Sequence, residues 1–237
     1  MKTGVIVLAR DQAKDRVVAE ECADYLISKG RKNVRTAFYL GDEKPEDLMR
    51  SMYHEGIDTF VVLPLVISEG RHSVWLMPKS VLLPDNYGSW TMLDGKDVAL
   101  RFATALGADS RMADELLSIA GEPEDNSAAL LVSYGSPFSY ANKDMEYYAQ
   151  RFKEKGWCVQ RASLTNGISL EDAVEKIVQQ GKDEVKVIPF FVSPNSDSFK
   201  KVKGILNKYQ LNVTYLDTIT AIPIYKEILN SKVPEGW

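Results

Sequence analysis

A short polar segment, Ser68-Glu69-Gly70-Arg71-His72, follows the most apolar stretch in the N-terminal half of the chain. The apolar stretch reads Phe-Val-Val-Leu-Pro-Leu-Val-Ile over 60–67, which predicts a strand buried on both faces of a parallel sheet. In open α/β sheets, ligands bind beyond the carboxyl ends of such strands. A carboxylate, a guanidinium and an imidazole gathered there could transfer a proton, bind an anion or hold a metal ion.

The same order of features returns in the C-terminal half. The stretch Val185 to Phe199 again contains a strand with a proline, an aliphatic run and a polar exit. An offset of 125 residues carries Pro64 onto Pro189 and His72 onto Asp197. It also matches three residues of the preceding helical segment with their counterparts: Glu46 with Glu171, Asp47 with Asp172, and Gly56 with Gly181. Several matches at one offset, in matching local contexts, indicate a duplicated unit.

The elements that must position these residues alternate between strand and helix. Apolar runs predict strands at 4–9, 34–40, 60–67, 98–102, 128–132, 159–164, from 185, and 213–216. Helical spacing and end signals predict helices at 17–27, 45–56, 111–120, 145–152, 170–181 and 224–229. Strands alternating with helices give parallel sheets with right-handed crossovers. We therefore predict an α/β protein of two tandem parallel-sheet domains, with strand ends lining a cleft between them.

A polar segment divides the two halves. Residues 121–127 contain no large apolar side chain and place a proline beside acids, which is typical of a linker. We expect an N-terminal repeat over 1–121, a linker over 122–127 and a C-terminal repeat over 128–237.

Composition narrows the classes of partner. Of the 237 residues, 45% are hydrophobic and 26% are charged, as in ordinary globular proteins. A net charge of -4 argues against a nucleic-acid or membrane-surface partner, because both favour a basic stripe. No apolar run is long enough to span a bilayer, and the N-terminus enters a strand without a cleavable signal, so we expect a cytoplasmic protein. Cys22 and Cys158 are expected to be buried, reduced thiols.

Three segments carry a resemblance to a known family. Pro64-Leu65 with Gly70-Arg71-His72 is similar to the P-L-x-x-x-x-G-R-H signature of the class II tetrapyrrole chelatases, the sirohydrochlorin cobaltochelatases and their nickel- and ferro-chelatase relatives. Leu106-Gly107-Ala108-Asp109 resembles a late leucine-glycine-x-aspartate segment of that family. Tyr134-Gly135-Ser136 resembles the glycine-serine exit of its first strand.

The resemblance covers nearly the whole chain as two tandem copies, as in the long form of the cobaltochelatase. It implies two flavodoxin-like domains and a cleft where a tetrapyrrole receives a metal during siroheme or cobalamin biosynthesis. The metal, Co²⁺, Ni²⁺ or Fe²⁺, would be a substrate, and no organic cofactor is implied.

The chain departs from the family at the metal-binding positions. The family carries one histidine at the end of the first strand and another in the G-R-H segment. Here the first-strand positions are Arg10 and Tyr134, and the G-R-H positions are His72 and Asp197. Tyr39-Leu40 occupies the neighbourhood of the family's acid at the end of the second strand.

Metal insertion needs a transient ligand for the ion and a base for the pyrrole protons. We expect His72 to serve as ligand or base, with Glu69 and Tyr134 as further catalytic groups and Asp197 as a second metal ligand. Such a mixed imidazole and carboxylate site favours cobalt, nickel or iron over ions that seek thiolates.

The remaining polar groups suit an anionic substrate. Arg10 would repel a cation but can bind a substrate carboxylate through paired hydrogen bonds. Arg71 and Ser136 are further candidates for substrate binding. Because two linked repeats already supply both walls of a cleft, we expect a monomer.

Other interpretations stay open. The chain could be a non-catalytic relative that kept the pocket, lost the metal ligands, and carries or senses a tetrapyrrole or another anion. A clamp for a small anion, of the periplasmic-binding type, is a third interpretation. Single residues also have plain structural roles available: His72 as a hydrogen-bonded loop residue, Arg10 as a surface cation paired with Asp11 or Glu69, and Tyr134 as a turn residue.

Overall fold

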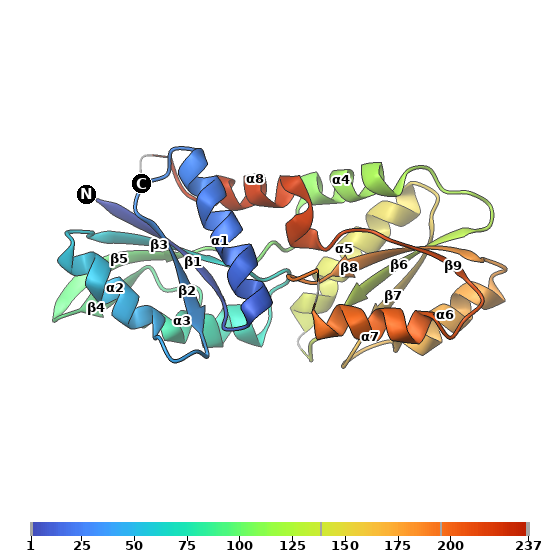
Figure 1. Cartoon of the computed structure of the whole chain (residues 1–237), viewed down its shortest axis with the longest axis horizontal. Coiled ribbons are helices and arrows are strands. Elements are labelled where there is room, and N and C mark those ends of the chain that lie inside the picture. Colours follow the sequence, from blue (N-terminus) through green and yellow to red (C-terminus); the bar gives the residue numbers. More distant parts are fainter. Residues whose placement is uncertain (1, 138, 195, 236–237) are drawn as a thin grey trace. The chain divides into compact units, whose positions relative to one another are not determined.

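The structure is a computed structural model that describes residues 2–137, 139–194 and 196–235 (Figure 1). It contains two compact units. Unit 1 comprises Met1–Leu106 and Lys226–Trp237, and unit 2 comprises Gly107–Tyr225. Within the described ranges, no helix combines the length and the apolar character needed to cross a membrane.

Unit 1 is built on a five-stranded sheet. In hydrogen-bonded order, its strands are β2 (Val34–Tyr39), β1 (Thr3–Arg10), β3 (Thr59–Pro64), β5 (Lys96–Phe102) and β4 (Trp90–Leu93). Strands β2, β1, β3 and β5 run parallel, which confirms the predicted α/β architecture, and β4 adds an antiparallel edge that the sequence analysis did not predict. The chain passes from β1 to β2 on one side and then to β3 on the other. The strand order therefore reverses between β1 and β3, which is where flavodoxin-like sheets bind ligands.

Helices cover both faces of this sheet. They are α1 (Ala13–Ser28), α2 (Pro45–His54), the π-helical turn η1 (His72–Leu76) and the short α3 (Met77–Ser80). Successive side chains of a strand point to opposite faces, and the side chains from Val5 to Ala9 are all at most 2% exposed. Such burial on both faces explains why this strand and β3 are continuous apolar runs in the sequence.

Unit 2 repeats this plan on a four-stranded, wholly parallel sheet. Its strands, in order, are β7 (Cys158–Ser163), β6 (Ser127–Ser133), β8 (Glu184–Phe190) and β9 (Asn212–Tyr215). The helical segments that begin in this unit are α4 (Ser110–Ala120), α5 (Ser139–Glu154), α6 (Leu170–Gln179), α7 (Asp197–Leu206), η2 (Ile219–Ala221) and α8 (Pro223–Ser231). Helix α7 was not predicted from the sequence, which placed only a polar exit at its start.

The two cysteines are free and differ in exposure. Cys22 is buried in α1, and burial raises the pKa of its thiol to about 12. Cys158 at the start of β7 is only half-buried. The expectation of a buried thiol therefore holds for Cys22 alone.

The compact units divide the chain differently from the predicted repeats, whose boundaries lie at 121 and 128. Helix α4 comes before the predicted linker but belongs to unit 2, and the chain from Lys226, which contains most of α8, belongs to unit 1. The last helix of the first predicted repeat, α4, therefore belongs to unit 2, and most of the last helix of the second, α8, belongs to unit 1.

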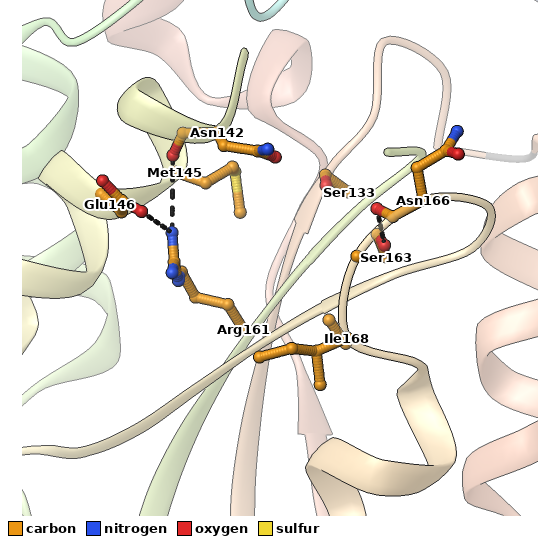
Figure 2. A pocket seen from close by; sticks show the side chains of 10 residues that line it. Ser133, Asn142, Met145, Glu146, Arg161, Ser163, Asn166 and Ile168 are labelled. Atoms are coloured by element: carbon orange, nitrogen blue, oxygen red, sulfur yellow. Dashed lines mark hydrogen bonds and ion pairs between the residues drawn. The ribbon is translucent and has the colours of Figure 1, made fainter. Parts of the chain in front are cut away.

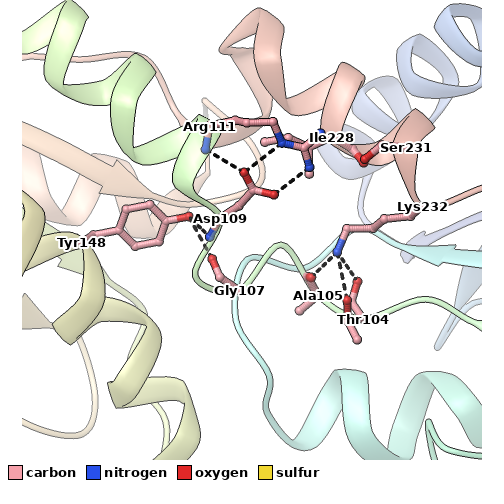
Figure 3. Close-up of polar contacts among 9 residues, drawn as sticks. All are labelled: Thr104, Ala105, Gly107, Asp109, Arg111, Tyr148, Ile228, Ser231 and Lys232. Carbon is pink, nitrogen blue, oxygen red and sulfur yellow. Dashed lines mark hydrogen bonds and ion pairs between the residues drawn. The ribbon is translucent and has the colours of Figure 1, made fainter.

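Hydrogen bonds tie both exchanged helices into their units (Figure 3). In unit 2, the Tyr148 hydroxyl donates to the carbonyl oxygen of Gly107, before α4, at 2.8 Å, and Lys186 Nζ donates to the Ala120 carbonyl oxygen at its end. In unit 1, Lys232 Nζ donates to the Thr104 carbonyl oxygen at 3.0 Å.

Candidate functional site

The first candidate site lies at the carboxyl end of the unit 1 sheet, where β1 ends at Arg10 and β2 ends at Tyr39. These two residues are direct neighbours in the parallel register. The chain that leaves β3 reaches His72 at the start of η1, and the Tyr39 hydroxyl lies 2.6 Å from Nδ1 of His72. The two rings meet edge to face, with 5.8 Å between their centroids. π-Helical turns are frequent at functional sites, and this one begins with the candidate base.

The surroundings of His72 favour its neutral form. Burial is the main cause that lowers the pKa of the imidazole, and the positive charges of Arg10 and Arg71 lower it further. Although His72 is exposed overall, its Nδ1 faces the hydroxyl of the buried Tyr39. Burial raises the pKa of the Tyr39 hydroxyl to about 12. At neutral pH, the pair is therefore a neutral imidazole hydrogen-bonded to a neutral phenol.

Sequence reasoning missed two members of this group. Tyr39 was noted only as the replacement for an acid, although its place at a strand end marks it as a candidate in the same way as Arg10. Asp15, in the first turn of α1, has its pKa raised by burial, against the opposing charges of Arg10 and Lys14. No sequence pattern singles out Asp15, because its burial depends on how α1 lies on the sheet.

Glu69 is held by several hydrogen bonds within unit 1. Its Oε1 accepts from the Ala105 backbone amide at 3.1 Å, and its Oε2 accepts from Nδ2 of Asn86 at 3.1 Å. The hydroxyl of Ser73 lies 3.4 Å from the same Oε2. The carboxylate thus joins the turn before His72 to two other segments, and its visible role is to fix that turn.

The second group of predicted residues lies at the carboxyl end of the unit 2 sheet. Tyr134 follows β6, and its residue is 59% exposed. Its carbonyl oxygen accepts from the Leu164 amide at 3.1 Å and from the Thr165 hydroxyl at 2.9 Å. Gly135 has φ of 95°, and a Cβ there would meet the backbone of Asn166 at 2.9 Å, so the turn requires glycine.

Ser136 and Asp197 complete that group. Ser136 is half-buried in the loop after β6. Asp197 is the first residue of α7, with a side chain 94% exposed and 3.5 Å from Nζ of Lys200. The predicted cleft that would bring Ser136, Asp197 and Tyr134 opposite His72 stays a prediction.

The described residues contain no group of three or more His, Cys, Asp and Glu side chains that could hold a metal ion. His72 has arginines and a tyrosine as its charged and polar neighbours. A cation would be repelled by Arg10 and Arg71, whereas a carboxylate would be attracted by both. The unit 1 site is therefore better suited to an anionic substrate with a basic nitrogen beside it than to a resident metal.

The fold and this site define a class: duplicated, flavodoxin-like α/β proteins with a neutral histidine beside cations at the strand ends. The chain belongs to the CbiX family, whose model matches residues 9–121 and 128–235. Two copies of the family domain therefore lie in tandem, as the internal repeat predicted.

The chain is similar to one named relative and to two solved structures. The sirohydrochlorin cobaltochelatase of Methanosarcina acetivorans is 28% identical over 102 residues, which are 42% of this chain and 78% of that protein. The structure of SirB from Bacillus subtilis with Fe³⁺ has a TM-score of 0.74 at 16% identity, with 98% of this chain and 94% of that one covered.

A multi-domain protein of Deinococcus radiodurans with structural similarity to chelatases has a TM-score of 0.73 at 16% identity. It covers all of this chain, which in turn spans 55% of the Deinococcus protein. At these identities, the structural matches establish the shared fold.

Proposed function

We propose that this protein inserts a divalent metal, Co²⁺, Ni²⁺ or Fe²⁺, into a sirohydrochlorin-type tetrapyrrole, with His72 as the base or transient metal ligand. The observation that carries the proposal is the neutral His72 imidazole, held by Tyr39 at the switch point of a CbiX-family sheet. Its support is the family membership together with the name of the Methanosarcina relative.

The chemistry of His72 follows from its hydrogen bond. A neutral imidazole has one nitrogen with a lone pair, and Nδ1 is the nitrogen that faces the Tyr39 hydroxyl. When Nδ1–H donates to the phenol oxygen, Nε2 is free to accept a pyrrole proton or to bind a metal ion. After Nε2 takes a proton, both nitrogens carry hydrogen, and the phenol can still accept from Nδ1. The Tyr39 hydroxyl thus serves His72 before and after the proton transfer.

Arg10 and Arg71 are proposed to bind carboxylates on the rim of the macrocycle. Both act on His72 through their charge and are exposed to solvent, so a large anionic substrate can reach them. Loss of two pyrrole protons makes the macrocycle more negative, and nearby guanidinium groups favour that change.

The residues predicted at the carboxyl end of the unit 2 sheet are proposed to act on the substrate as well. In this proposal, Asp197 offers a carboxylate ligand to the incoming metal, Tyr134 a phenol, and Ser136 a hydroxyl for the substrate. The exposure of Asp197 and Tyr134 leaves both side chains accessible to a large ligand.

A second candidate function is a non-catalytic tetrapyrrole carrier or sensor. The observation in its favour is the lack, among the described residues, of any group of three His, Cys, Asp and Glu side chains that could hold a metal. A carrier would need the arginines and an apolar surface for the macrocycle, but it would not need the basic nitrogen of His72.

An anaerobic insertion assay separates the two functions. The protein is mixed with sirohydrochlorin and Co²⁺, Ni²⁺ or Fe²⁺, and the absorbance change is followed against the uncatalysed rate. A chelatase accelerates the change, and His72→Ala removes the acceleration while macrocycle binding persists.

The matched control is His54→Ala, because His54 is the other histidine and is an exposed residue that lies 3.0 Å from Asp94 on the surface. Macrocycle binding by the wild-type protein without any acceleration would contradict the chelatase and support the carrier.

A further inference from the structure

Unit 2 contains a pocket of about 160 Å³ beside the carboxyl end of β7, next to the turn that carries Tyr134 (Figure 2). Its walls come from the ends of β6 and β7, from α5 and from the loop before α6. The side chains that matter for its chemistry are Ser133, Asn142, Met145, Arg161, Ser163 and Ile168.

The registers of the two sheets show which residues of unit 1 correspond to this pocket. In unit 1, Leu8 pairs with Pro64 on one side and Ala37 on the other; in unit 2, Val132 pairs with Pro189 and Ala162. Ala37 and Ala162 are therefore equivalent. The next residues along these strands, Phe38 and Ser163, are equivalent as well.

The helices α1 and α5 align through their ends. The amide of Arg31 donates to the Leu26 carbonyl oxygen, and the amide of Trp157 donates to the Phe152 carbonyl oxygen. Counting back from these matched turns makes Arg16 of α1 equivalent to Asn142 of α5.

In unit 1, the side chains at the two equivalent positions are large and pack on each other. The Arg16 guanidinium carbon lies 4.2 Å from the centroid of the Phe38 ring. Unit 2 has the shorter side chains of Asn142 and Ser163 at the equivalent positions, and the pocket is the volume that they leave open. Because Asn142 and Ile168 in its wall are exposed, the pocket opens to solvent and a small ligand can enter it, which makes it a candidate binding site.

The wall of the pocket contains one cation, Arg161, paired with one carboxylate, Glu146. Nη1 of Arg161 lies 3.3 Å from Oε1 of Glu146 and donates to the Asn142 carbonyl oxygen at 3.4 Å. The side chain of Glu146 is 61% exposed, so this surface ion pair is weak and can yield to a competing carboxylate. Ser133 places a hydroxyl along the same wall, whereas the Ser163 hydroxyl already donates to the Asn166 carbonyl oxygen (Figure 2).

We propose that this pocket binds a short carboxylic acid group, with Arg161 on the carboxylate and Met145 and Ile168 along the alkyl chain. A cavity of about 150 Å³ accommodates a benzene molecule, so the present volume suits roughly six non-hydrogen atoms. An acetate or propionate group meets that limit.

Two sources can supply such a group. One is an acetate or propionate arm of a tetrapyrrole, and this source rests on the proposed function. The other is a free short-chain carboxylic acid, which does not rest on it. Binding of a free acid can therefore be observed even if the protein does not insert metals.

The test uses the whole protein, with propionate as the probe and propionamide as its uncharged counterpart. Backbone amide NMR shifts should change around β7 and α5 with propionate and not with propionamide. Arg161→Gln should weaken propionate binding roughly ten- to hundredfold, because a hydrogen-bonded charge is lost. Ser163→Phe should abolish it by restoring the residue found in unit 1, and Glu146→Gln should strengthen it.

Lys153→Gln is the matched control, because Lys153 is an exposed cation on the same helix, outside the pocket, and its loss should leave propionate binding unchanged. A thermal melt of each variant confirms that it is folded. Arg161→Gln keeps the test decisive if Ser163→Phe does not fold.

The same variants distinguish the sources when sirohydrochlorin binding is measured by absorbance. Weaker macrocycle binding in Ser163→Phe and Arg161→Gln assigns the pocket to a tetrapyrrole arm. Unchanged macrocycle binding with lost propionate binding assigns it to a free acid. The proposal is overturned if propionate causes no shifts at the pocket, if propionamide binds equally well, or if Arg161→Gln binds propionate as tightly as the wild type.

Discussion

The imidazole of His72 is the group on which the proposed chemistry depends, and its protonation can be measured directly. The chain has only two histidines, so their ring signals can be assigned with a single His54→Asn variant. Because burial and two arginines lower the pKa of His72, its titration midpoint should lie below the ordinary value of about 6.5. Arg10→Gln removes one of the charges and should move the midpoint upward in an NMR titration. A midpoint unmoved by this variant would show that Arg10 does not act on His72.

The lowered pKa of His72 also predicts how the stability of the fold changes with pH. A histidine whose pKa is lower in the folded state contributes stability above its unfolded pKa, because the native state then holds the preferred neutral form. That contribution is lost as the pH falls through the unfolded value toward the folded one, since the unfolded chain binds the proton more readily. Metal insertion that uses neutral His72 should accordingly persist somewhat below pH 6.5 and then fall.

Tyr39 is predicted to position His72. Tyr39→Phe keeps the buried ring but removes the hydroxyl that lies 2.6 Å from Nδ1. Outer-shell hydrogen bonds to a functional histidine are typically worth ten- to a hundredfold in activity or metal affinity, so we expect a loss of about tenfold or more in the insertion rate. Nitrogen NMR shifts of the His72 ring should report a changed tautomer ratio in the protein without metal. Unchanged shifts together with an unchanged rate would remove Tyr39 from the site.

At the scale of elements, the turn between β3 and η1 depends on Glu69. Glu69→Ala removes the acceptor shared by the Ala105 amide and Asn86, and it should lower the free energy of unfolding by about 2 kcal/mol. The prediction is checked by urea denaturation. A Glu69 that instead acts directly on the substrate would lose activity on mutation to Gln or Ala with little change in unfolding free energy.

The sequence predicted the parallel strands because burial on both faces leaves a visible mark, a continuous apolar run. Two further elements left other signals in the sequence but were missed. Helix α7 follows the capping residue Ser196 and buries Phe199, Val202 and Ile205 at helical spacing. Strand β4 alternates between exposed and buried residues and precedes Asp94-Gly95. An Asp-Gly pair is a strong sequence signal for a hairpin turn, and both residues have the positive φ angles that such a turn requires.

The site was predictable in part. The order of strands and helices in the sequence predicts that Arg10, Arg71 and His72 lie at the carboxyl ends of strands. The partner of His72 does not, because Tyr39 lies 33 residues away and meets it only through the packing of β2 beside β1. Comparing the two repeats at one fixed offset also fails to reveal the pocket in unit 2. The reason is that α1 and α5 align at a different offset from the strands.

At the scale of the whole molecule, the exchange of α4 and α8 separates the repeat from the folding unit. Sequence repeats mark what was duplicated, whereas compact units mark which segments bury each other's side chains. Arg31 of unit 1 illustrates the difference: its guanidinium donates to Oδ1 of Asn230 at 2.8 Å and to the Val233 carbonyl oxygen at 3.1 Å. These partners come from the far end of the sequence, so the first repeat alone cannot complete unit 1.

The exchange predicts how fragments of the chain behave. Residues 107–225 form all of unit 2 in one continuous segment and should fold alone. Residues 122–237, the predicted C-terminal repeat with its linker, lack α4, in which Met112, Ala113, Leu116 and Ala120 are buried. Leaving Met112 and Leu116 without their partners forgoes about 3–6 kcal/mol, which is comparable with the total stability of a small domain.

Circular dichroism and thermal unfolding of the two fragments provide the measurement. We expect a cooperative transition for 107–225 and none, or one at a much lower temperature, for 122–237. The matched control is a fragment of 107–225 with Met112→Ala and Leu116→Ala, which keeps the length of the segment but loses the same buried side chains. It should behave like 122–237, because the contribution of α4 lies in those side chains. Equal cooperative unfolding of 107–225 and 122–237 would mean that the repeat itself is the folding unit and that the exchanged helices add little to either half.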